Sequence, residues 1–451
     1  MMNSDIIIIG AGPGGYETAV YAAKRGLSVT IIESEKPGGT CLNEGCIPTK
    51  SFCRNAALME DLKHAEQFGI NDLSYTFDFK KVVERKNEVV RTLVQGVKFL
   101  MKNKLITYVQ GKASFKNENT VLVNGEEYTA KNIIIATGSV TKYLPIEGKS
   151  LSGVITSKEI LDIDHIPERL CIIGAGVIGL EFASIFNAFG SKVTVLEYMK
   201  EILPSFDTDL TKRLKQSFVK KGIEITNQAA VQKINKSETD GELVVSYEFK
   251  GETKECIADT VLMAVGRAAN VDSLNLSDIN IAFSPKGIEV NESMQTNRPH
   301  IYAVGDVNGK CLLAHAATFQ GMIAIHHILG EKDNIRLDVM PSAVFTFPEV
   351  ATVGLTEEQC KEKGIAYKAK KSFFRANGKA ISMNEPDGFC KILSDENGKI
   401  LGCHLFGAHA ADLIHEISSL INKGTTVQEF KDMIHAHPTL SEVIQECGKE
   451  F

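Results

Sequence analysis

A glycine-rich pattern that occurs twice constrains the fold of this 451-residue chain more than any other feature. The copies occupy residues 10–15 and 174–179 and fit the form Gly-x-Gly-x-x-Gly. Each copy lies between an apolar strand-like stretch and a helix-like stretch, and a second strand-like stretch then ends in Glu33 or Glu197. Such glycines let backbone N–H groups approach a pyrophosphate, and the carboxylate of the acid accepts hydrogen bonds from the hydroxyl groups of a ribose. The glycines are Gly10, Gly12 and Gly15 in the first copy and Gly174, Gly176 and Gly179 in the second.

The two copies, about 165 residues apart, predict two Rossmann-like dinucleotide-binding domains rather than a solenoid. The remaining C-terminal stretch has no such pattern and mixes strand-like with helix-like segments, so we expect an α/β protein with a separate C-terminal α+β domain. The predicted strands are 5–9, 28–33, 113–115, 120–123, 126–128, 132–139, 170–173, 192–197, 260–267, 300–306, 342–347 and 389–393. The predicted helices are 16–25, a long stretch that includes 82–100, then 180–189 and 411–420.

Composition excludes several classes of protein. The formal net charge is −6 and no basic block occurs, so the sequence has no electrostatic footprint for nucleic acid. No apolar run reaches the length of a membrane span, and the run at residues 6–9 ends in glycines, as a buried parallel strand does. No transit segment precedes it, so we expect a cytoplasmic protein without membrane or nucleic-acid partners.

Two of the ten cysteines are close in sequence, Cys41 and Cys46. At helical pitch they lie about one and a half turns apart, and a slightly distorted first turn would bring them within disulfide distance. A disulfide at a helix start beside a bound flavin relays two electrons between thiols and flavin. The other cysteines lack the spacing of a zinc site, so we expect no metal and eight reduced, mostly buried thiols: Cys53, Cys171, Cys256, Cys311, Cys360, Cys390, Cys403 and Cys447.

Five motifs in order along the chain resemble the dihydrolipoyl dehydrogenases of the flavin disulfide reductase family. They are Gly-Gly-Thr-Cys-Leu-Asn-Glu-Gly-Cys-Ile-Pro-Thr-Lys (38–50), Ala-Thr-Gly-Ser (136–139), Gly-Ala-Gly-Val-Ile-Gly-Leu-Glu (174–181), Tyr-Ala-Val-Gly-Asp (302–306) and His-Ala-His-Pro-Thr-Leu-Ser-Glu (435–442). The resemblance implies four segments: 1–148 and 267–334 as two parts of an FAD-binding domain, 149–266 as an NAD-binding domain, and 335–451 as a dimerisation domain.

The resemblance also implies a role for each candidate residue. Cys46 would face the flavin and Cys41 would exchange with substrate, while Lys50 would lie near the flavin and pair with Glu181. His437 would be the acid–base, oriented by Glu442 and acting in the partner subunit's site, so that the enzyme is an obligate homodimer. The residues implied to bind FAD are Gly10, Gly12, Gly15, Glu33, Thr40, Lys50, Ala113, Thr137, Gly138, Asp306 and Ala314. Those implied to bind NAD are Gly174, Gly176, Ile178, Gly179, Glu197 and Gly266.

The residue types alone leave alternatives open for several positions. Lys50 could be a solvated lysine at a helix start, His437 a structural histidine, and Asp306 a helix N-cap. Glu197 could be an exposed strand end. Glu44 and Thr49 depart from frequent choices of the family, and the Glu44 carboxylate would either oppose thiolate formation or point to solvent.

The expected reaction transfers electrons from dihydrolipoyl thiols through Cys41–Cys46 and FAD to NAD⁺. The expected partner is the lipoyl-bearing acyltransferase core of a 2-oxo acid dehydrogenase complex or a lipoylated glycine-cleavage carrier protein. Glu197 would repel a 2′-phosphate, and only Lys200 lies near it in sequence, so NAD is favoured over NADP. One alternative is an NAD(P)H-dependent reductase of a small disulfide such as glutathione disulfide, which Leu42-Asn43, Val177 and Glu197 argue against. Another is a flavoprotein that serves a complex only as a structural subunit.

Overall fold

The computed structural model describes residues 2–237 and 241–451 and divides into two compact units. Unit 1 consists of residues 1–51, 80–142 and 266–337, and unit 2 consists of residues 52–79, 143–265 and 338–451. Unit 2 thus contains most of the residues predicted for the NAD-binding and dimerisation domains. The four-segment division made from the sequence stays a prediction. The two units are described separately below.

Unit 1 is built on a seven-stranded sheet whose parallel part has the order β3-β2-β1-β6-β19, with β5 and β4 added antiparallel to the first half of β6. Its strands are β1 (Met2–Ile9), β2 (Val29–Glu33), β3 (Ile106–Gln110), β4 (Ala113–Asn117), β5 (Thr120–Val123), β6 (Glu126–Ile135), β7 (Ser139–Thr141), β16 (Arg267–Ala269), β17 (Phe283–Ser284), β18 (Gly287–Ile288) and β19 (Ile301–Ala303). Its helices are α1 (Pro13–Lys24), α2 (Gly39–Glu44), the start of α3 (Cys46–Lys63), most of α4 (Phe79–Leu100), η3 (Leu276–Ile279), η4 (Gly305–Asn308) and α7 (Ala314–Leu329).

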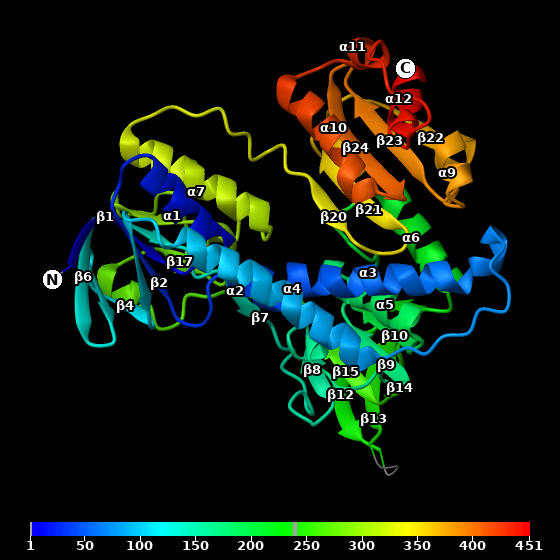
Figure 1. Cartoon of the computed structure of the whole chain (residues 1–451), viewed down its shortest axis with the longest axis horizontal. Helices are drawn as coiled ribbons and strands as arrows, with labels where there is room; N and C mark the ends of the chain where they lie inside the picture. The colour runs from blue at the N-terminus through cyan, green and yellow to red at the C-terminus, as the bar shows by residue number, and fades with distance from the viewer. Residues whose placement is uncertain (1, 238–240) are drawn as a thin grey trace. The chain divides into compact units, whose positions relative to one another are not determined.

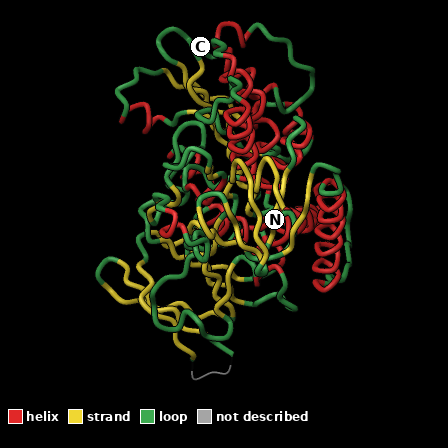
Figure 2. The backbone as a smooth tube through the Cα atoms, turned by 90° about the vertical axis from the view of Figure 1, so that its left-hand side faces the viewer, coloured by secondary structure: helices red, strands yellow, loops and turns green. Residues whose placement is uncertain are grey.

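The central strand β1 shows why this sheet forms. Ile7 and Ile9 pack into the apolar core on one face, and Ile6 and Ile8 pack into the core on the other. All four side chains are almost fully buried, as expected for a parallel strand covered on both faces. Helices α1 and α7 lie side by side over one face (Figure 1), and the strands beside the N-terminus appear in yellow in Figure 2.

The first half of unit 2 repeats this arrangement with the strand order β11-β10-β9-β15-β8, all parallel, and carries a separate antiparallel sheet β12-β13-β14. The strands are β8 (Val154–Thr156), β9 (Arg169–Ile173), β10 (Lys192–Glu197), β11 (Glu224–Asn227), β12 (Ala230–Lys236), β13 (Leu243–Phe249), β14 (Glu252–Ala258) and β15 (Thr260–Met263). The helices are η1 (Ala65–Phe68), η2 (Glu159–Leu161), α5 (Val177–Phe189) and α6 (Thr208–Lys220).

The second half of unit 2 is an antiparallel sheet of order β20-β21-β24-β23-β22 with α10 packed against it (Figure 1). Its strands are β20 (Ser342–Val344), β21 (Glu349–Gly354), β22 (Lys368–Phe373), β23 (Phe389–Ser394) and β24 (Ile400–Gly407). Its helices are α8 (Glu357–Glu362), η5 (Phe374–Ala376), α9 (Gly378–Ser382), α10 (Ala410–Lys423), α11 (Val427–Lys431) and α12 (Glu442–Lys449). The predicted α/β class with a C-terminal α+β region is confirmed.

Three predicted strands differ from the structure in an informative way. The predicted strands 126–128 and 132–139 are mostly one long strand, β6, and the predicted strand 260–267 stops at Met263. After it, Gly266 has a φ of +103°, a left-handed conformation that interrupts the strand before β16. Within the described ranges, no helix combines the length and apolarity needed to cross a bilayer.

Candidate redox and dinucleotide-binding site

The first glycine pattern forms a tight turn between β1 and α1 that only glycine fits. Gly10 has a φ of +107°, and a Cβ atom there would lie 2.3 Å from the carbonyl oxygen of Ala136. A Cβ atom at Gly15 would lie 1.9 Å from the carbonyl oxygen of Gly10. Gly12 is the N-cap of α1, so no cap side chain occupies the helix start, which is where a phosphate would bind.

Glu33, at the end of β2, is fixed against this turn. One carboxylate oxygen accepts a hydrogen bond from the N–H of Ala11 at 2.7 Å, and the other accepts one from the N–H of Glu35 at 2.8 Å. The side chain is 8% exposed. A carboxylate held here retains free lone pairs for ribose hydroxyls, so the turn and its acid fit the adenosine half of FAD.

The second glycine pattern has the same geometry in unit 2. Gly174 has a φ of +107°, and a Cβ atom at Gly179 would lie 2.0 Å from the carbonyl oxygen of Gly174. The N-cap of α5 is Gly176, again without a side-chain cap. The buried Glu197 carboxylate accepts hydrogen bonds from the N–H groups of Ala175 and Met199 at 2.5 and 2.6 Å. The exposed strand-end alternative for Glu197 is therefore wrong, and the site fits NAD.

The sequence predicts that the cysteine segment is a helix whose first turn is distorted. The structure instead has two helices that are separated by a break. Cys41 lies in α2 and Cys46 begins α3, and the break between them is Gly45, with φ −141° and ψ −108°. A Cβ atom at Gly45 would lie 3.0 Å from the carbonyl oxygen of Thr40, so the break is closely packed. The expected distortion between the two cysteines is therefore a break of the helix at Gly45.

The side chains of Cys41 and Cys46 interact with each other. A hydrogen bond with the Cys46 thiol, together with burial, raises the pKa of Cys41, and the positive charge of Lys50 opposes this change. Cys41 is half-buried and Cys46 is exposed. Of the other eight cysteines, six are buried and two, Cys256 and Cys311, are half-buried, so the prediction that they are mostly buried is confirmed. Formation of a Cys41–Cys46 disulfide stays a prediction.

Three side chains in unit 1 form a hydrogen-bond chain that the sequence analysis missed. Arg267 donates from Nε to the Ser139 hydroxyl at 2.7 Å and from Nη2 to the Ser139 carbonyl at 2.6 Å. The Ser139 hydroxyl donates to the Asp306 carboxylate at 2.5 Å. Asp306 therefore bonds a serine of β7 and does not cap η4, whose N-cap is Val304. The only sequence signal was that Ser139 and Arg267 each follow a glycine at a strand end.

The remaining FAD candidates also lie in unit 1. Thr40 lies in α2 and Lys50 in α3, while Ala113 is buried at the start of β4 and Ala314 begins α7. Thr137 donates from its hydroxyl to the Asn270 carbonyl at 2.6 Å, just before Gly138.

Two NAD candidates lie in different units. Ile178 lies in the first turn of α5 in unit 2, and Gly266 lies in unit 1. The buried Glu181, also on α5, accepts a hydrogen bond from the N–H of Phe345 at 3.0 Å. The pairing of Glu181 with Lys50 stays a prediction.

The C-terminal histidine and its acid are in contact. His437 Nδ1 lies 2.9 Å from Glu442 Oε1, and the other carboxylate oxygen accepts the N–H of Thr439 at 2.8 Å. These two hydrogen bonds hold the pKa of Glu442 below its usual value. The His437 side chain is 79% exposed, so its ring is anchored at one nitrogen and open at the other. The neighbouring His435 instead bonds through Nε2 with Glu416 Oε1 at 2.6 Å.

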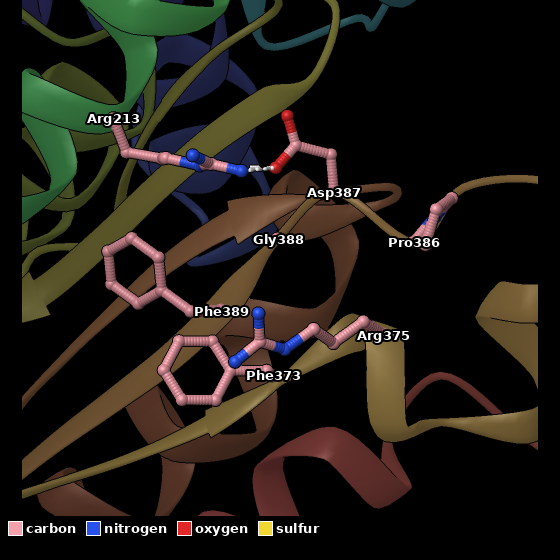
Figure 3. A pocket seen from close by; sticks show the side chains of 7 residues that line it. All are labelled: Arg213, Phe373, Arg375, Pro386, Asp387, Gly388 and Phe389. Atoms are coloured by element: carbon pink, nitrogen blue, oxygen red, sulfur yellow. Dashed lines mark hydrogen bonds and ion pairs between the residues drawn. The ribbon is translucent and has the colours of Figure 1, made fainter.

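A hollow of about 200 Å³ in unit 2 contains none of the residues predicted from the sequence. Figure 3 shows that Arg213 faces Asp387 across it, with which it forms an ion pair, and that the Arg375 guanidinium lies over the Phe373 ring at 4.9 Å. Its lining is completed by Pro386, Gly388 and Phe389.

Comparison with known proteins agrees with this geometry. Residues 4–321 match the family described as pyridine nucleotide-disulphide oxidoreductase, and residues 340–447 match the dimerisation domain of the same family. The solved structure of the HOCl-induced flavoprotein disulfide reductase RclA from Escherichia coli superposes with a TM-score of 0.88 at 30% identity, covering 99% of each chain.

Curated relatives narrow the assignment. The chain is 40% identical to dihydrolipoyl dehydrogenase of Chlamydia muridarum, covering 98% of this chain and 96% of the relative. It is also 40% identical to dihydrolipoyl dehydrogenase of Geobacillus stearothermophilus, covering 99% and 96%. The chain therefore belongs to the pyridine nucleotide-disulphide oxidoreductase family and, within it, to the dihydrolipoyl dehydrogenases, flavoenzymes that use FAD and NAD.

Proposed function

We propose that the protein reoxidises protein-bound dihydrolipoyl groups with Cys41 and Cys46 and passes the electrons through FAD to NAD⁺. The observation that carries this proposal is the pair of interacting thiols on a segment that covers the first glycine turn. A Cβ atom at Gly39, two residues before Cys41, would lie 2.6 Å from Gly12 Cα. The redox pair therefore begins where the first dinucleotide is expected to bind.

The chain's own residues account for the thiol chemistry. With Cys41 and Cys46 joined as a disulfide, the open nitrogen of His437 takes a proton from one substrate thiol. The substrate thiolate attacks Cys41 Sγ, which forms a mixed disulfide and releases Cys46 as a thiolate. The second substrate thiol then attacks the substrate sulfur of that disulfide and closes the lipoyl ring, and its proton passes to the departing Cys41 sulfur, which leaves Cys41 as a thiol. Bound FAD supplies the two-electron acceptor that restores the Cys41–Cys46 disulfide and the hydride that reduces NAD⁺.

One hydrogen bond and one nearby charge prepare groups for these steps. The Glu442 carboxylate accepts from His437 Nδ1, which leaves Nε2 as the basic nitrogen and stabilises the ring once it is protonated. The charge of Lys50 favours the thiolate form of Cys41, which must leave when the lipoyl ring closes.

A homodimer completes the proposed site. The dimerisation-domain match and the exposed face of His437 support an active site that takes His437 from the partner chain. The substrate would be lipoyl groups on the acyltransferase core of a 2-oxo acid dehydrogenase complex or on a glycine-cleavage carrier protein.

The test is steady-state turnover with dihydrolipoamide and NAD⁺, run beside glutathione disulfide with NADPH. We expect turnover with the first pair, and turnover with the second pair alone would contradict the proposal. Reduction by two electrons should also give a long-wavelength charge-transfer absorbance. Cys41→Ser should keep that band without reducing substrate, while Cys46→Ser should abolish it. A band that survives in Cys46→Ser would mean that the two sulfur roles are reversed.

Subunit sharing is tested by refolding inactive Cys41→Ser and inactive His437→Gln homodimers together. If each site takes its histidine from the partner, mixed dimers contain one intact site and regain activity. Mixed dimers shown to have formed but without activity would mean that the histidine acts within its own chain or not at all.

A further inference from the structure

Arg267 fixes the direction in which the Ser139 hydroxyl donates its hydrogen bond. A guanidinium only donates, so the Ser139 hydroxyl must accept from Arg267 Nε and is left to donate its one hydrogen to Asp306. The second Arg267 bond, to the Ser139 carbonyl, uses the fork geometry of the guanidinium. The strands that carry these residues, β7 and β16, pair antiparallel, with Ser139 opposite Ala269. The carboxylate of Asp306 is thus fixed by a cation that acts through a hydroxyl.

The same guanidinium also reaches the cysteine segment. Its Nη2 lies 3.5 Å from the hydroxyl of Thr40, the residue before Cys41. Burial lowers the pKa of Arg267, and the negative charges of Asp306, Glu44 and Cys46 oppose that change. Arg267 is therefore within electrostatic range of both the redox sulfur and Glu44, the acid that departs from frequent family choices.

We propose that Arg267 is a positioning residue of the redox centre: through Ser139 it fixes the Asp306 carboxylate, and its charge offsets that of Glu44, which precedes Cys46 by two residues in the sequence. Glu44 without such a cation would disfavour the Cys46 thiolate, because a like charge nearby destabilises an anion. This inference deepens the proposed function and depends on the sulfur roles given there.

The charged and titratable groups around the cysteine pair come from several elements. The charge of Lys50 on α3 opposes the rise in the pKa of Cys41. Besides burial, the charges of Glu17 and Cys41 raise the pKa of Tyr16 on α1. The charge of Asp306 opposes the lowering of the pKa of Arg267 by burial, and it adds to burial in raising the pKa of Cys311. Since the proposed variants change only Arg267, Ser139 or Glu44, these other charges stay constant and differences between variants report the proposed interactions.

The experiment measures two properties of the flavin-loaded protein. The first is the pH midpoint of the charge-transfer absorbance after reduction with dithionite, which needs no lipoyl substrate. The second is the rate of flavin release in dilute guanidinium, followed by fluorescence. Arg267→Gln should raise the pH midpoint by roughly 0.5 pH unit, because the thiolate loses a nearby positive charge. Glu44→Gln should lower the pH midpoint, and the double variant should return it toward the parent value. Ser139→Ala and Arg267→Gln should speed flavin release several-fold, whereas Glu44→Gln should not.

Arg298→Gln is the matched control. Arg298 is also a partly buried arginine of unit 1, and it bonds the Ile279 carbonyl at 3.1 Å and pairs with Glu118 at 3.1 Å, away from the cysteine segment. An Arg267→Gln midpoint equal to that of Arg298→Gln or of the parent would overturn the proposal, even if dihydrolipoamide turnover is normal. Absence of that turnover in the parent protein would instead overturn the proposed function.

Arg267→Lys covers the case in which Arg267→Gln does not retain flavin. Retention by the lysine variant with a parent-like midpoint would support the role of the charge. Loss of flavin from both variants alike would contradict it and leave a purely steric role.

Discussion

The two dinucleotide turns of this chain have nearly identical backbones but different surroundings. In both, the first glycine has a φ of +107° and the last leaves no space for a Cβ atom. In both, the buried acid at the next strand end, Glu33 or Glu197, bonds the N–H of the residue after the first glycine. At the middle glycine they differ: a Cβ at Gly12 would meet Gly39 Cα at 3.8 Å, whereas a Cβ at Gly176 would meet nothing within 4 Å.

The different surroundings of Gly12 and Gly176 indicate that the same dinucleotide-binding turn serves two different purposes. The first turn is covered by the segment that carries Cys41 and Cys46, which suits a dinucleotide that stays bound. The second turn is open at the same position, which suits a dinucleotide that enters and leaves in every cycle. The same local geometry therefore serves a resident cofactor and an exchangeable one, according to what packs over it.

The sharpest test of the comparison is to damage each turn with one methyl group. In Gly15→Ala and Gly179→Ala the new Cβ would lie 1.9 Å and 2.0 Å from a carbonyl oxygen of its own turn. We expect Gly15→Ala to purify without FAD. Gly179→Ala should keep FAD but lose NADH binding. Flavin absorbance and NADH titration measure both effects, and flavin loss from Gly179→Ala would show that the two sites are not separable.

His437→Gln should slow the half-reaction between substrate thiols and the cysteine pair but not the half-reaction between the flavin and NADH. Dihydrolipoyl thiols are mostly protonated near neutral pH, so removing the base should slow thiol–disulfide exchange by roughly 10²–10⁴. Hydride exchange between NADH and the flavin should stay nearly intact. Glu442→Gln should be milder, because Glu442 orients the ring and does not transfer the proton. Stopped-flow measurement of the two half-reactions distinguishes them, and an equal loss in both would contradict the assignment.

The acid of the second turn should set cofactor choice. A 2′-phosphate would meet the fixed Glu197 carboxylate, so NADH should exceed NADPH by at least about tenfold in kcat/KM, which corresponds to about 1.4 kcal/mol. Glu197→Gln should narrow this ratio, whereas Glu33→Gln, its counterpart at the first turn, should leave the ratio unchanged and weaken FAD retention. Equal use of both nicotinamide cofactors by the parent enzyme would refute this prediction.

The smallest expected effect concerns the opposite ends of the same strands. Hydrogen bonds from the N–H of Ser28, then from Lys131 and the Ser28 hydroxyl, lower the pKa of Asp5 from 3.8 to about 2. A depressed carboxyl pKa stabilises the folded state above the unfolded value, and this stability is lost as pH falls from 3.8 toward about 2. The Asp5 side chain is 30% exposed and its partner Lys131 is largely exposed, so Asp5→Asn should cost less than about 1 kcal/mol at neutral pH.

Acid unfolding followed by circular dichroism checks this prediction. The curves of the parent and of Asp5→Asn should converge below pH 4. In unit 2 the corresponding position is Arg169, which donates hydrogen bonds to the Asp259 carboxylate. Burial alone would raise the pKa of Asp259, but these bonds and the charge of Arg169 outweigh burial, so that the pKa is lowered. Asp259→Asn should therefore give the same convergence, and a difference that persists in acid would show that neither effect is electrostatic.

Local motifs were predictable because their physics is local. In the turn of residues 10–15, the positive φ of Gly10 and the approach of Gly15 to the Gly10 carbonyl involve neighbouring residues only, and the apolar run at 6–9 can only be a strand covered on both faces. The cysteine segment was only partly predictable. Its residues indicated a redox pair on a distorted turn, but the place where the helix breaks, Gly45, packed against Thr40, is given only by the structure.

The sequence by itself determined that this chain has two dinucleotide turns, a redox cysteine pair and a histidine followed by an acid, because each is encoded by neighbouring residues. Only the tertiary structure decided that Arg267, Ser139 and Asp306 form one hydrogen-bond chain. It also decided that the cysteine segment covers one turn while the other stays open. These contacts join residues far apart in sequence, and their spacing carries no periodic signal, since such groups meet only when the sheets and helices pack.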